Sequence, residues 1–348
     1  MTQNAKGVVR VLHEVGLHAR PSVRLTQLAK SFSSRIEFGP SDRELDPGLG
    51  DLAQPLEESP RAGSAGLGGA VLLAIDVGNT EVTLGLFHGR RLTRSFRLSS
   101  ETRRTADELT LVLAQVFPEL ASRGEHAAVI ASVVPTATAS YLEAARKFCG
   151  GEPLEVSSAI ETGVGVEYRD PESAGADRIA NAAAALALYG APIIIVDFGT
   201  ATTFDVILRE RRYVGGVIAP GIVTGAEHLI RRAARLSAFE IKAPRRVVGR
   251  STEESLQSGV YYGAVGQVDA IVRRIAAEER IKPRVIATGG LASMIAAHSE
   301  TIEKVDPDLT LHGLRIIHEL NAGGAARKGA APRRGPAVSP AKRKKPRG

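Results

Sequence analysis

The sequence contains one chemical pattern twice, about one domain length apart. VLLAIDVGNTEVTLGLF, which starts at Val71, is an apolar strand, an Asp-x-Gly turn with threonine, and a second strand of alternating character. IIIVDFGTATTFDVIL, which starts at Ile193, is built in the same way. The two aspartates, Asp76 and Asp197, lie 121 residues apart, a spacing typical of duplicated domains. The chain is therefore expected to contain two similar halves.

Between and after the two copies, segments typical of strands alternate with segments typical of helices. VIASVV, from Val129, is predicted to be a buried strand, and ADRIANAAAALALYG to be an Ala-rich helix that ends at Gly190. RVIATGGLASMIAAH is predicted to form a strand, a double-glycine turn and a helix. Hydrophobic residues make up 43% of the chain but aromatic residues only 4%, so the core should be aliphatic. This pattern favours an α/β architecture in each half.

Changes in composition divide the 348 residues into five segments. Residues 1–38 alternate well enough to be structured, whereas residues 39–69 are dense in Gly, Pro, Ser and Asp and are predicted to be a flexible linker. The globular pattern then covers one half at 70–190 and the other at 191–324. Residues 325–348 contain nine Lys or Arg and no acidic residue, which predicts a disordered basic tail.

The distribution of charge and cysteine limits the possible classes of protein. The net charge is +7, but the tail accounts for all of the excess and leaves the rest of the chain at −2. This balance favours a folded enzyme with an extension over a protein that binds a specific nucleic acid. The single cysteine cannot form an internal disulfide, and there is neither an apolar signal segment nor a membrane-spanning run. We therefore expect a soluble, cytoplasmic protein without a membrane partner.

The two Asp-x-Gly turns have the residue types that phosphate binding requires. A carboxylate at the end of a buried strand can hold a hydrated magnesium ion near phosphate, and glycine exposes backbone N–H groups to phosphate oxygens. No GxxxxGK[ST] motif occurs, so backbone dipoles and metal would replace its lysine. The second turn adds Thr200, Thr202 and Thr203, and the two turns together could hold a triphosphate. The alternatives are a simple hairpin turn and, for Thr203, strand propensity.

The segment GADR, Gly175–Arg178, opens the Ala-rich helix with a carboxylate beside a guanidinium. Asp177 could simply cap the helix. Alternatively, it could accept a hydroxyl proton while Arg178 pairs with an anionic substrate, an arrangement suited to phosphorylating an alcohol on a small acid. GGVIAPG, Gly215–Gly221, and TGG, Thr288–Gly290, indicate either backbone close to something flat or charged, or glycines needed only for turns.

Taken in order, six motifs resemble those of the type III pantothenate kinases: Asp-x-Gly-Asn-Thr, GADR, DFGTATT, GG-x-I-x-PG, GRSTEESLQSGVYYGAVGQVD and TGG. The resemblance covers about 250 residues. It implies an α/β fold of the acetate and sugar kinase, Hsp70 and actin superfamily, with two ribonuclease-H-like halves and ATP with Mg²⁺ in the cleft. It also implies phosphorylation of pantothenate to 4'-phosphopantothenate, the first step of coenzyme A biosynthesis. The expected assembly is a homodimer whose pantothenate pocket lies at the subunit interface.

The resemblance also implies roles for single residues. The first phosphate loop and a further ATP contact are implied at Asp76, Val77, Gly78, Asn79, Thr80, Glu81, Val82, Thr83 and Thr200. Asp177 would accept the proton of the pantothenate hydroxyl, and Asp197 would bind a monovalent cation, K⁺ or NH₄⁺. The implied pantothenate contacts are Tyr168, Gly175, Ala176, Asp177, Arg178 and Thr252. One departure is Ser237, which stands where relatives often have proline, and none of these roles depends on it.

The amino-terminal segment resembles a different family. VGLHARPSVRLTQLAKSFSSRIEF, Val15–Phe38, is similar to the active-site region of the histidine-containing phosphocarrier protein of the sugar phosphotransferase system. The resemblance implies phosphorylation of His18, with Arg20 beside it and a helix N-terminus at Pro21. That family's domain is roughly twice as long, so this fragment could not bury its apolar face. We therefore expect a truncated relic or a misplaced translation start.

Three classes of function remain open from the sequence. The first is the kinase, and the second is a non-catalytic transcriptional accessory factor of the same fold. The third is a phosphate relay or nucleic-acid-binding protein that uses His18 or the basic tail, since such a tail binds polyanions without sequence preference. The presence of Asp76, Asp177 and Asp197 favours the kinase, because a purely regulatory protein has no physical need for all three.

Overall fold

The structure is a computed structural model that describes residues 71–100, 103–121, 126–232 and 239–327. The phosphocarrier-like segment with His18 and Arg20, the linker, Ser237 and residues 328–348 of the predicted tail lie outside these ranges. No helix among the described residues is long and apolar enough to cross a membrane.

The first half is built on a five-stranded sheet with the strand order β3-β2-β1-β4-β5. Three strands form an antiparallel meander and two more run parallel to β1. The strands are β1 (Val71–Val77), β2 (Glu81–His88), β3 (Arg91–Ser99), β4 (Ala127–Ser132) and β5 (Leu154–Glu155). The helices on its outer face are α2 (Ala106–Val116), η1 (Pro118–Ala121) and α3 (Pro135–Cys149).

The second half repeats this plan. Its sheet has the order β11-β10-β7-β8-β9-β6, in which β9-β8-β7-β10-β11 corresponds strand for strand to the first sheet. The strands are β6 (Gly165–Val166), β7 (Ile193–Phe198), β8 (Ala201–Leu208), β9 (Arg212–Pro220), β10 (Arg284–Gly289) and β11 (Lys304–Val305), with η3 (Arg209–Arg211) between β8 and β9. The duplication predicted from the two Asp-x-Gly segments is therefore confirmed. One strand crosses over, because β6 precedes the second repeat in sequence but pairs with β9.

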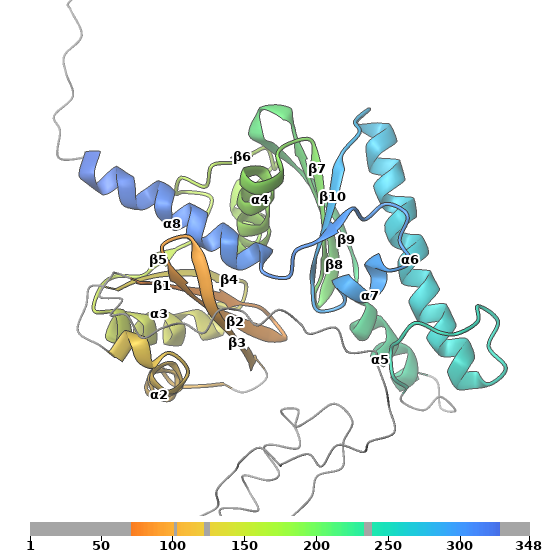
Figure 1. The fold of residues 1–348 in the computed structure, drawn as a ribbon, viewed down its shortest axis with the longest axis horizontal. Coiled ribbons are helices and arrows are strands. Elements are labelled where there is room, and N and C mark those ends of the chain that lie inside the picture. Colours follow the sequence, from red (N-terminus) through yellow and green to blue (C-terminus); the bar gives the residue numbers. More distant parts are fainter. Residues whose placement is uncertain (1–70, 101–102, 122–125, 233–238, 328–348) are drawn as a thin grey trace, which may run out of the picture. The chain divides into compact units, whose positions relative to one another are not determined.

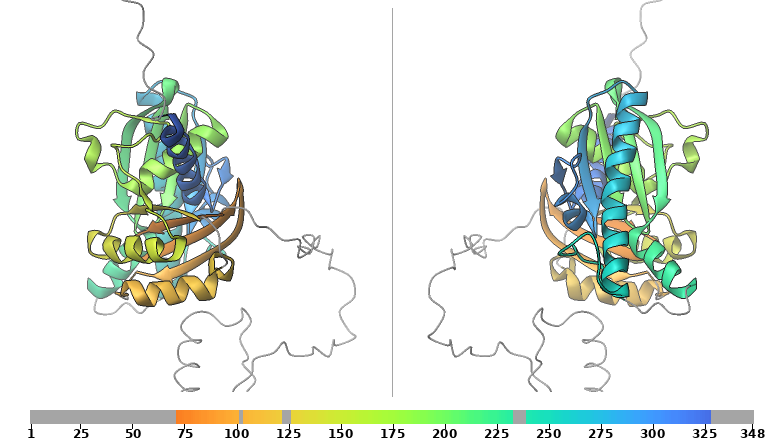
Figure 2. Two further views of the ribbon diagram at one scale, coloured as in Figure 1. Left: turned by 90° about the vertical axis from the view of Figure 1, so that its left-hand side faces the viewer. Right: turned by 90° about the vertical axis from the view of Figure 1, so that its right-hand side faces the viewer.

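The elements form five layers (Figure 1). The long helices α4 (Ala176–Tyr189) and α8 (Leu309–Arg327) lie between the two sheets and share one core with the facing sides of both. Helices α6 (Thr252–Glu278) and α7 (Ala292–Ala296) cover the outer face of the second sheet, and Figure 2 shows α6 running along the length of that sheet. The remaining helices are η2 (Pro171–Ser173) and α5 (Ile222–Arg232).

Helix α4 is rich in alanine because it has neighbours on every side. Ala180, Ala184 and Ala185 are fully buried, and the helix ends as predicted at Gly190, which adopts a φ of 79°. Helix α8 comes so close that a Cβ added to Gly313 would lie 1.9 Å from the carbonyl oxygen of Ala180. Small residues at this crossing are therefore required by the separation of the two backbones.

Replacing Gly313 by alanine should push α8 away from α4. We expect Gly313→Ala to lower the free energy of unfolding by about 1–3 kcal/mol, the usual cost of overpacking. Gly266 on α6 is the matched control because nothing lies within 4 Å of its added Cβ. Gly266→Ala should be neutral or stabilise by up to about 1 kcal/mol. Urea unfolding followed by circular dichroism measures both, and equal midpoints for Gly313→Ala and the wild-type chain would contradict the packing argument.

Candidate active site

The two Asp-x-Gly turns meet at the junction between the halves. In the first turn the N–H of Gly78 donates to the carbonyl of Glu81 at 3.1 Å, and in the second the N–H of Gly199 donates to the carbonyl of Ala201 at 3.1 Å. The hydroxyl oxygens of Thr80 and Thr200 lie 2.7 Å apart. The structure thus places the two turns opposite each other, as the sequence analysis predicts.

Asp76 is the one polar residue of β1 and lies directly before its last residue, Val77. Burial raises the pKa of its carboxyl group well above the ordinary value, and the neighbouring carboxyl groups of Asp177 and Asp197 raise it further. Its Oδ1 atom is buried and has no hydrogen-bond partner among the described residues. A buried carboxylate oxygen without a donor is a costly feature, and a cation or its bound water would remove that cost.

Asp197 occupies the equivalent place at the end of β7. Its Oδ2 atom accepts a hydrogen bond from Nδ2 of Asn181 at 2.9 Å, and Oδ1 of Asn181 accepts one from the hydroxyl of Thr310 at 2.7 Å. Burial, followed by the charge of Asp177, raises the pKa of Asp197 to about 7. A positive ion beside this carboxylate would favour its ionised form.

The TGG motif explains how closely the backbone approaches Asp197. Gly289 has a φ of 90°, and a Cβ there would lie 2.6 Å from Oδ1 of Asp197. The glycine is therefore required both by its backbone conformation and by the adjacent carboxylate. Asn181 and Thr310 are site residues that the sequence alone does not identify. The available signal was Asn181, the polar residue that interrupts the alanines of α4.

Asp177 lies in the first turn of α4 but is not its N-cap residue. The N-cap residue is Gly175, which makes no side-chain cap hydrogen bond, and Oδ1 of Asp177 accepts from the adjacent N–H of Arg178 at 2.8 Å. Burial raises the pKa of Asp177, although that N–H and the charge of Arg178 oppose the shift. A carboxylate with a raised pKa is a stronger proton acceptor, which is the role that the resemblance implies.

Arg178 has an internal partner that was not anticipated from the sequence. Its Nε donates to Oδ1 of Asp205 at 2.7 Å, and its Nη2 lies 2.7 Å from the same oxygen. Nη1 donates to the hydroxyl of Tyr168 at 3.2 Å. The hydroxyl of Tyr213 also donates to Oδ1 of Asp205 at 2.7 Å. The guanidinium is therefore paired within the chain with Asp205, whereas the sequence suggests a pairing with an anionic substrate.

The glycines of GGVIAPG shape this part of the site. Gly215 has a φ of 118°, and its added Cβ would lie 3.2 Å from the ring of Tyr168. At Gly216 an added Cβ would lie 3.2 Å from Nη2 of Arg178 and would clash with the carbonyl of Phe204. This backbone lies beside an aromatic ring and a guanidinium, and the φ of Gly215 also fits the alternative that the glycines are needed for backbone conformation.

Thr252 lies on a different helix from the predicted pantothenate residues of the GADR segment. It is the first residue of α6, directly after the N-cap residue Ser251, whose side chain accepts from the N–H of Glu254. Within the described chain no hydrogen bond joins Thr252 to Tyr168 or Arg178. The resemblance groups Thr252 with these residues, and its role toward pantothenate stays a prediction.

The acidic residues fit a cation that is held only partly by protein. No group of three or more His, Cys, Asp or Glu side chains in the described ranges is arranged to hold a metal ion by itself. Asp177 and Asp197 are nevertheless close enough to raise the pKa of Asp76, and Asp177 raises the pKa of Asp197. Magnesium commonly keeps several waters and takes its other ligands from one or two carboxylates and substrate phosphates, so this donor set suits a metal that arrives with a nucleotide.

Comparison with protein families gives two matches. A family model described as type III pantothenate kinase matches residues 72–274. A second model, described as the PTS HPr component phosphorylation site, matches residues 5–46, in agreement with the phosphocarrier resemblance predicted there. The second match lies outside the described residues.

Curated relatives agree with the first match. The type III pantothenate kinase of Geobacter sulfurreducens is 48% identical over 72% of this chain and 99% of its own. The enzymes of the same name from Moorella thermoacetica and Halalkalibacterium halodurans are 45% and 44% identical, over 72% of this chain and 100% of theirs. With a family model that spans more than half of its length and relatives this similar, the chain belongs to the type III pantothenate kinases.

Proposed function

We propose that this chain transfers the γ-phosphoryl group of ATP to the primary hydroxyl of pantothenate, in the cytoplasm where ATP is available. The observation that carries the proposal is the convergence of Asp76, Asp177 and Asp197 where the two duplicated turns meet. Asp177 accepts the hydroxyl proton, the pantothenate oxygen forms a bond to the γ-phosphorus, and the bond between that phosphorus and the bridging oxygen of ADP breaks. The products are 4'-phosphopantothenate and ADP.

The two turns provide the phosphate end of the site. The donors proposed for phosphate oxygens are the N–H groups at the tip of the first turn, at Asn79 and Thr80, and the hydroxyl groups of Thr80 and Thr200, because the N–H of Gly78 already donates to Glu81. Magnesium bound with ATP would neutralise phosphate charge, and Asp76 is the residue that would hold it, through its water shell. No lysine of the usual phosphate-binding loop is present, so these fixed donors must supply more of the stabilisation of the phosphate charge.

Removing the proton acceptor should abolish most of the turnover. We expect Asp177→Asn to lower kcat by about 10²–10⁴-fold, the usual contribution of a general base. The asparagine side-chain oxygen can still accept from the N–H of Arg178, so the fold should be retained. The measurement is pantothenate-dependent ADP release in a coupled assay, with thermal unfolding recorded in parallel.

The control for this substitution is Asp107→Asn on α2. Asp107 is an exposed carboxylate paired with Lys147 at 3.0 Å, and it has no part in the site. Its variant should turn over within about twofold of wild type, since surface ion pairs contribute little. Unchanged turnover in Asp177→Asn would refute its assignment as the base. Absence of pantothenate-dependent turnover in the wild-type chain would instead favour the accessory-factor alternative.

We also propose a monovalent cation, K⁺ or NH₄⁺, at Asp197. The proposal is supported by the burial of this carboxylate, by the neighbouring charge of Asp177 and by the resulting pKa of about 7. A fixed cation there would offset the negative charge that phosphates bring to an already acidic site. Asn181 would hold the carboxylate in place, since its amide group donates to Oδ2.

Thermal unfolding can test the cation without reference to turnover. Because the folded pKa of Asp197 lies above its unfolded value of about 4, its stabilising contribution is complete below that value and is lost as the pH rises through about 7. K⁺ binds the ionised carboxylate, so KCl should raise Tm more at about pH 8 than at about pH 6, relative to NaCl at equal ionic strength. Asp197→Asn should lose this difference. An equal response of both chains to KCl would place the cation elsewhere.

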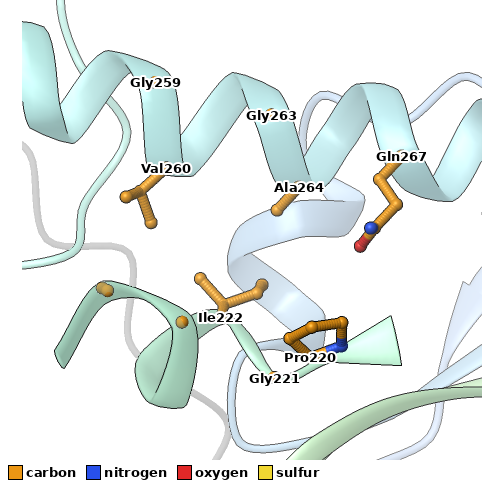
Figure 3. Close-up of a pocket in the computed structure, with 10 residues that line it drawn as sticks. Pro220, Gly221, Ile222, Gly259, Val260, Gly263, Ala264 and Gln267 are labelled. Atoms are coloured by element: carbon orange, nitrogen blue, oxygen red, sulfur yellow. The ribbon is translucent and has the colours of Figure 1, made fainter. Parts of the chain in front are cut away.

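We further propose a homodimer formed through the side of the molecule that carries α5 and α6. A groove of about 190 Å³ between these helices is lined by glycine and small apolar residues, and Figure 3 shows Ile222 and Ala264 facing each other across it. Exposed apolar side chains lie in the same stretch of sequence, at Ile218, Val223, Leu229, Val247 and Val248. Such a surface is typical of protein–protein contacts. A partner there would border the active site, because Gly221 contacts the backbone of Thr200.

Mass measurement by light scattering tests the dimer. The wild-type chain should show twice the 36.7 kDa of one chain. Gly263→Glu places a charge in the groove, where nothing lies within 4 Å of the added Cβ, so it should yield monomers without disturbing the fold. Leu111→Glu is the control, because Leu111 is 72% exposed on α2, away from the groove, and its variant should remain dimeric. A dimeric Gly263→Glu chain would exclude this surface.

A further inference from the structure

Asp205 is a fully buried carboxylate that the reaction described above does not use. It lies on β8 between Phe204 and Val206 and is 0% exposed. One of its oxygens, Oδ1, receives Nε of Arg178 and the hydroxyl of Tyr213, both at 2.7 Å. The hydroxyl of Thr203 lies 3.4 Å from the other oxygen. The carboxylate is thus surrounded by donors, and its strongest partner is a residue of the GADR segment.

The geometry of this pairing determines which edge of Arg178 remains available. Asp205 accepts from Nε and lies 2.7 Å from Nη2, which is buried and makes no hydrogen bond within the described chain. This leaves Nη1, which donates to the hydroxyl of Tyr168 at 3.2 Å. Arg178 itself is 8% exposed, whereas Tyr168 is half-buried. The charged pair therefore acts on the open part of the site mainly through the tyrosine.

Tyr168 is also held through its ring. It stacks on the ring of Tyr213 with the ring centres 5.8 Å apart and the planes only 4° from parallel. The Cζ atom of Arg178 lies 5.9 Å from both ring centres, and Gly215 leaves room for the Tyr168 ring on its other flank. Asp205 contacts both Arg178 and Tyr213, so a single carboxylate fixes the two groups that determine where Tyr168 lies.

We propose that Asp205 is the positioning residue of the acceptor-substrate end of the site: it orients Arg178, and through Arg178 and Tyr213 it sets the position of the Tyr168 hydroxyl. The inference rests on the proposed function and on the pantothenate contacts that the resemblance implies for Tyr168 and Arg178. With the hydroxyl already fixed, less ordering remains for the substrate to impose when it binds. Asp205 should therefore affect the acceptor substrate and leave ATP unaffected.

A purely structural role accounts poorly for this arrangement. A buried ion pair stabilises a fold little, and apolar residues of the same volume often serve as well. Here the pair is combined with a tyrosine stack and two close glycines, and the whole group ends at one half-buried hydroxyl. These contacts favour orientation over stability as the purpose of the carboxylate.

The test is the KM for each substrate in Asp205→Asn. We expect the KM for pantothenate to rise at least about tenfold, the effect of losing a hydrogen bond to a charged group, while the KM for ATP stays within about twofold. Tyr168→Phe should raise the pantothenate KM in the wild-type background but have little further effect in Asp205→Asn. That non-additivity is what a relay from Asp205 to Tyr168 requires, and a merely structural carboxylate would not produce it.

Two more variants keep the test decisive. Tyr213→Phe removes one donor to Asp205 while leaving the ring in place, and should raise the pantothenate KM selectively by about two- to fivefold. If Asp205→Asn does not fold, this variant tests the positioning role in its place. Asp269→Asn is the matched control. Asp269 is a buried carboxylate on α6 that accepts from the hydroxyl groups of Ser299 and Thr301, and its loss should lower Tm with both KM values unchanged.

The possible outcomes separate the two proposals. An active wild-type enzyme with a selective pantothenate effect in Asp205→Asn or Tyr213→Phe supports the positioning role. An active enzyme in which these variants change both KM values equally, or in which Tyr168→Phe has the same effect in either background, overturns it while leaving the proposed function intact. A wild-type chain that is folded but does not phosphorylate pantothenate overturns the proposed function, and the positioning role with it.

Discussion

The close packing of α4 between the two sheets is the constraint on which the active site depends. This helix carries Asp177 and Arg178 in its first turn and presents Asn181 to Asp197 one turn later. Its alanines allow both sheets and α8 to approach, and that approach brings the ends of β1 and β7 close enough for Thr80 to contact Thr200. A bulkier helix would separate the halves and, with them, the two phosphate turns.

Burial of carboxylates is the second constraint. It lowers the stability of the folded chain, whereas the packing of α4 raises it. Burial is the largest cause of the raised pKa values of Asp76, Asp177 and Asp197. Without compensating charge these groups work against folding. Asp205 has its compensation in Arg178, whose pKa is raised by this carboxylate despite the opposing effect of burial. The other three have no paired cation of comparable proximity among the described side chains, so the chemistry of the site and its stability both depend on what binds.

Much of the fold could be predicted because it repeats. The two Asp-x-Gly segments predicted the duplication, and Gly190 predicted the end of α4, since both signals are local. Asp205 could not be assigned in the same way. The sequence shows a carboxylate inside an apolar strand, but its partner lies 27 positions away and the pairing depends on how two elements pack. Thr252 illustrates the remaining limit, because a residue can match a motif while its place relative to the others depends on contacts that no local pattern encodes.

The packing of α8 against the first sheet has a consequence for folding during translation. Helix α8 ends the described chain but packs against the first sheet, where Leu311 fills the space above Gly85 on β2. The first half, although translated first, therefore cannot bury its inner face until residues 309–327 have left the ribosome. Domains usually fold in the order in which they are made. Since both halves share one core with α4 and α8, we expect nearly all of the kinase region to be synthesised before either half can be stable.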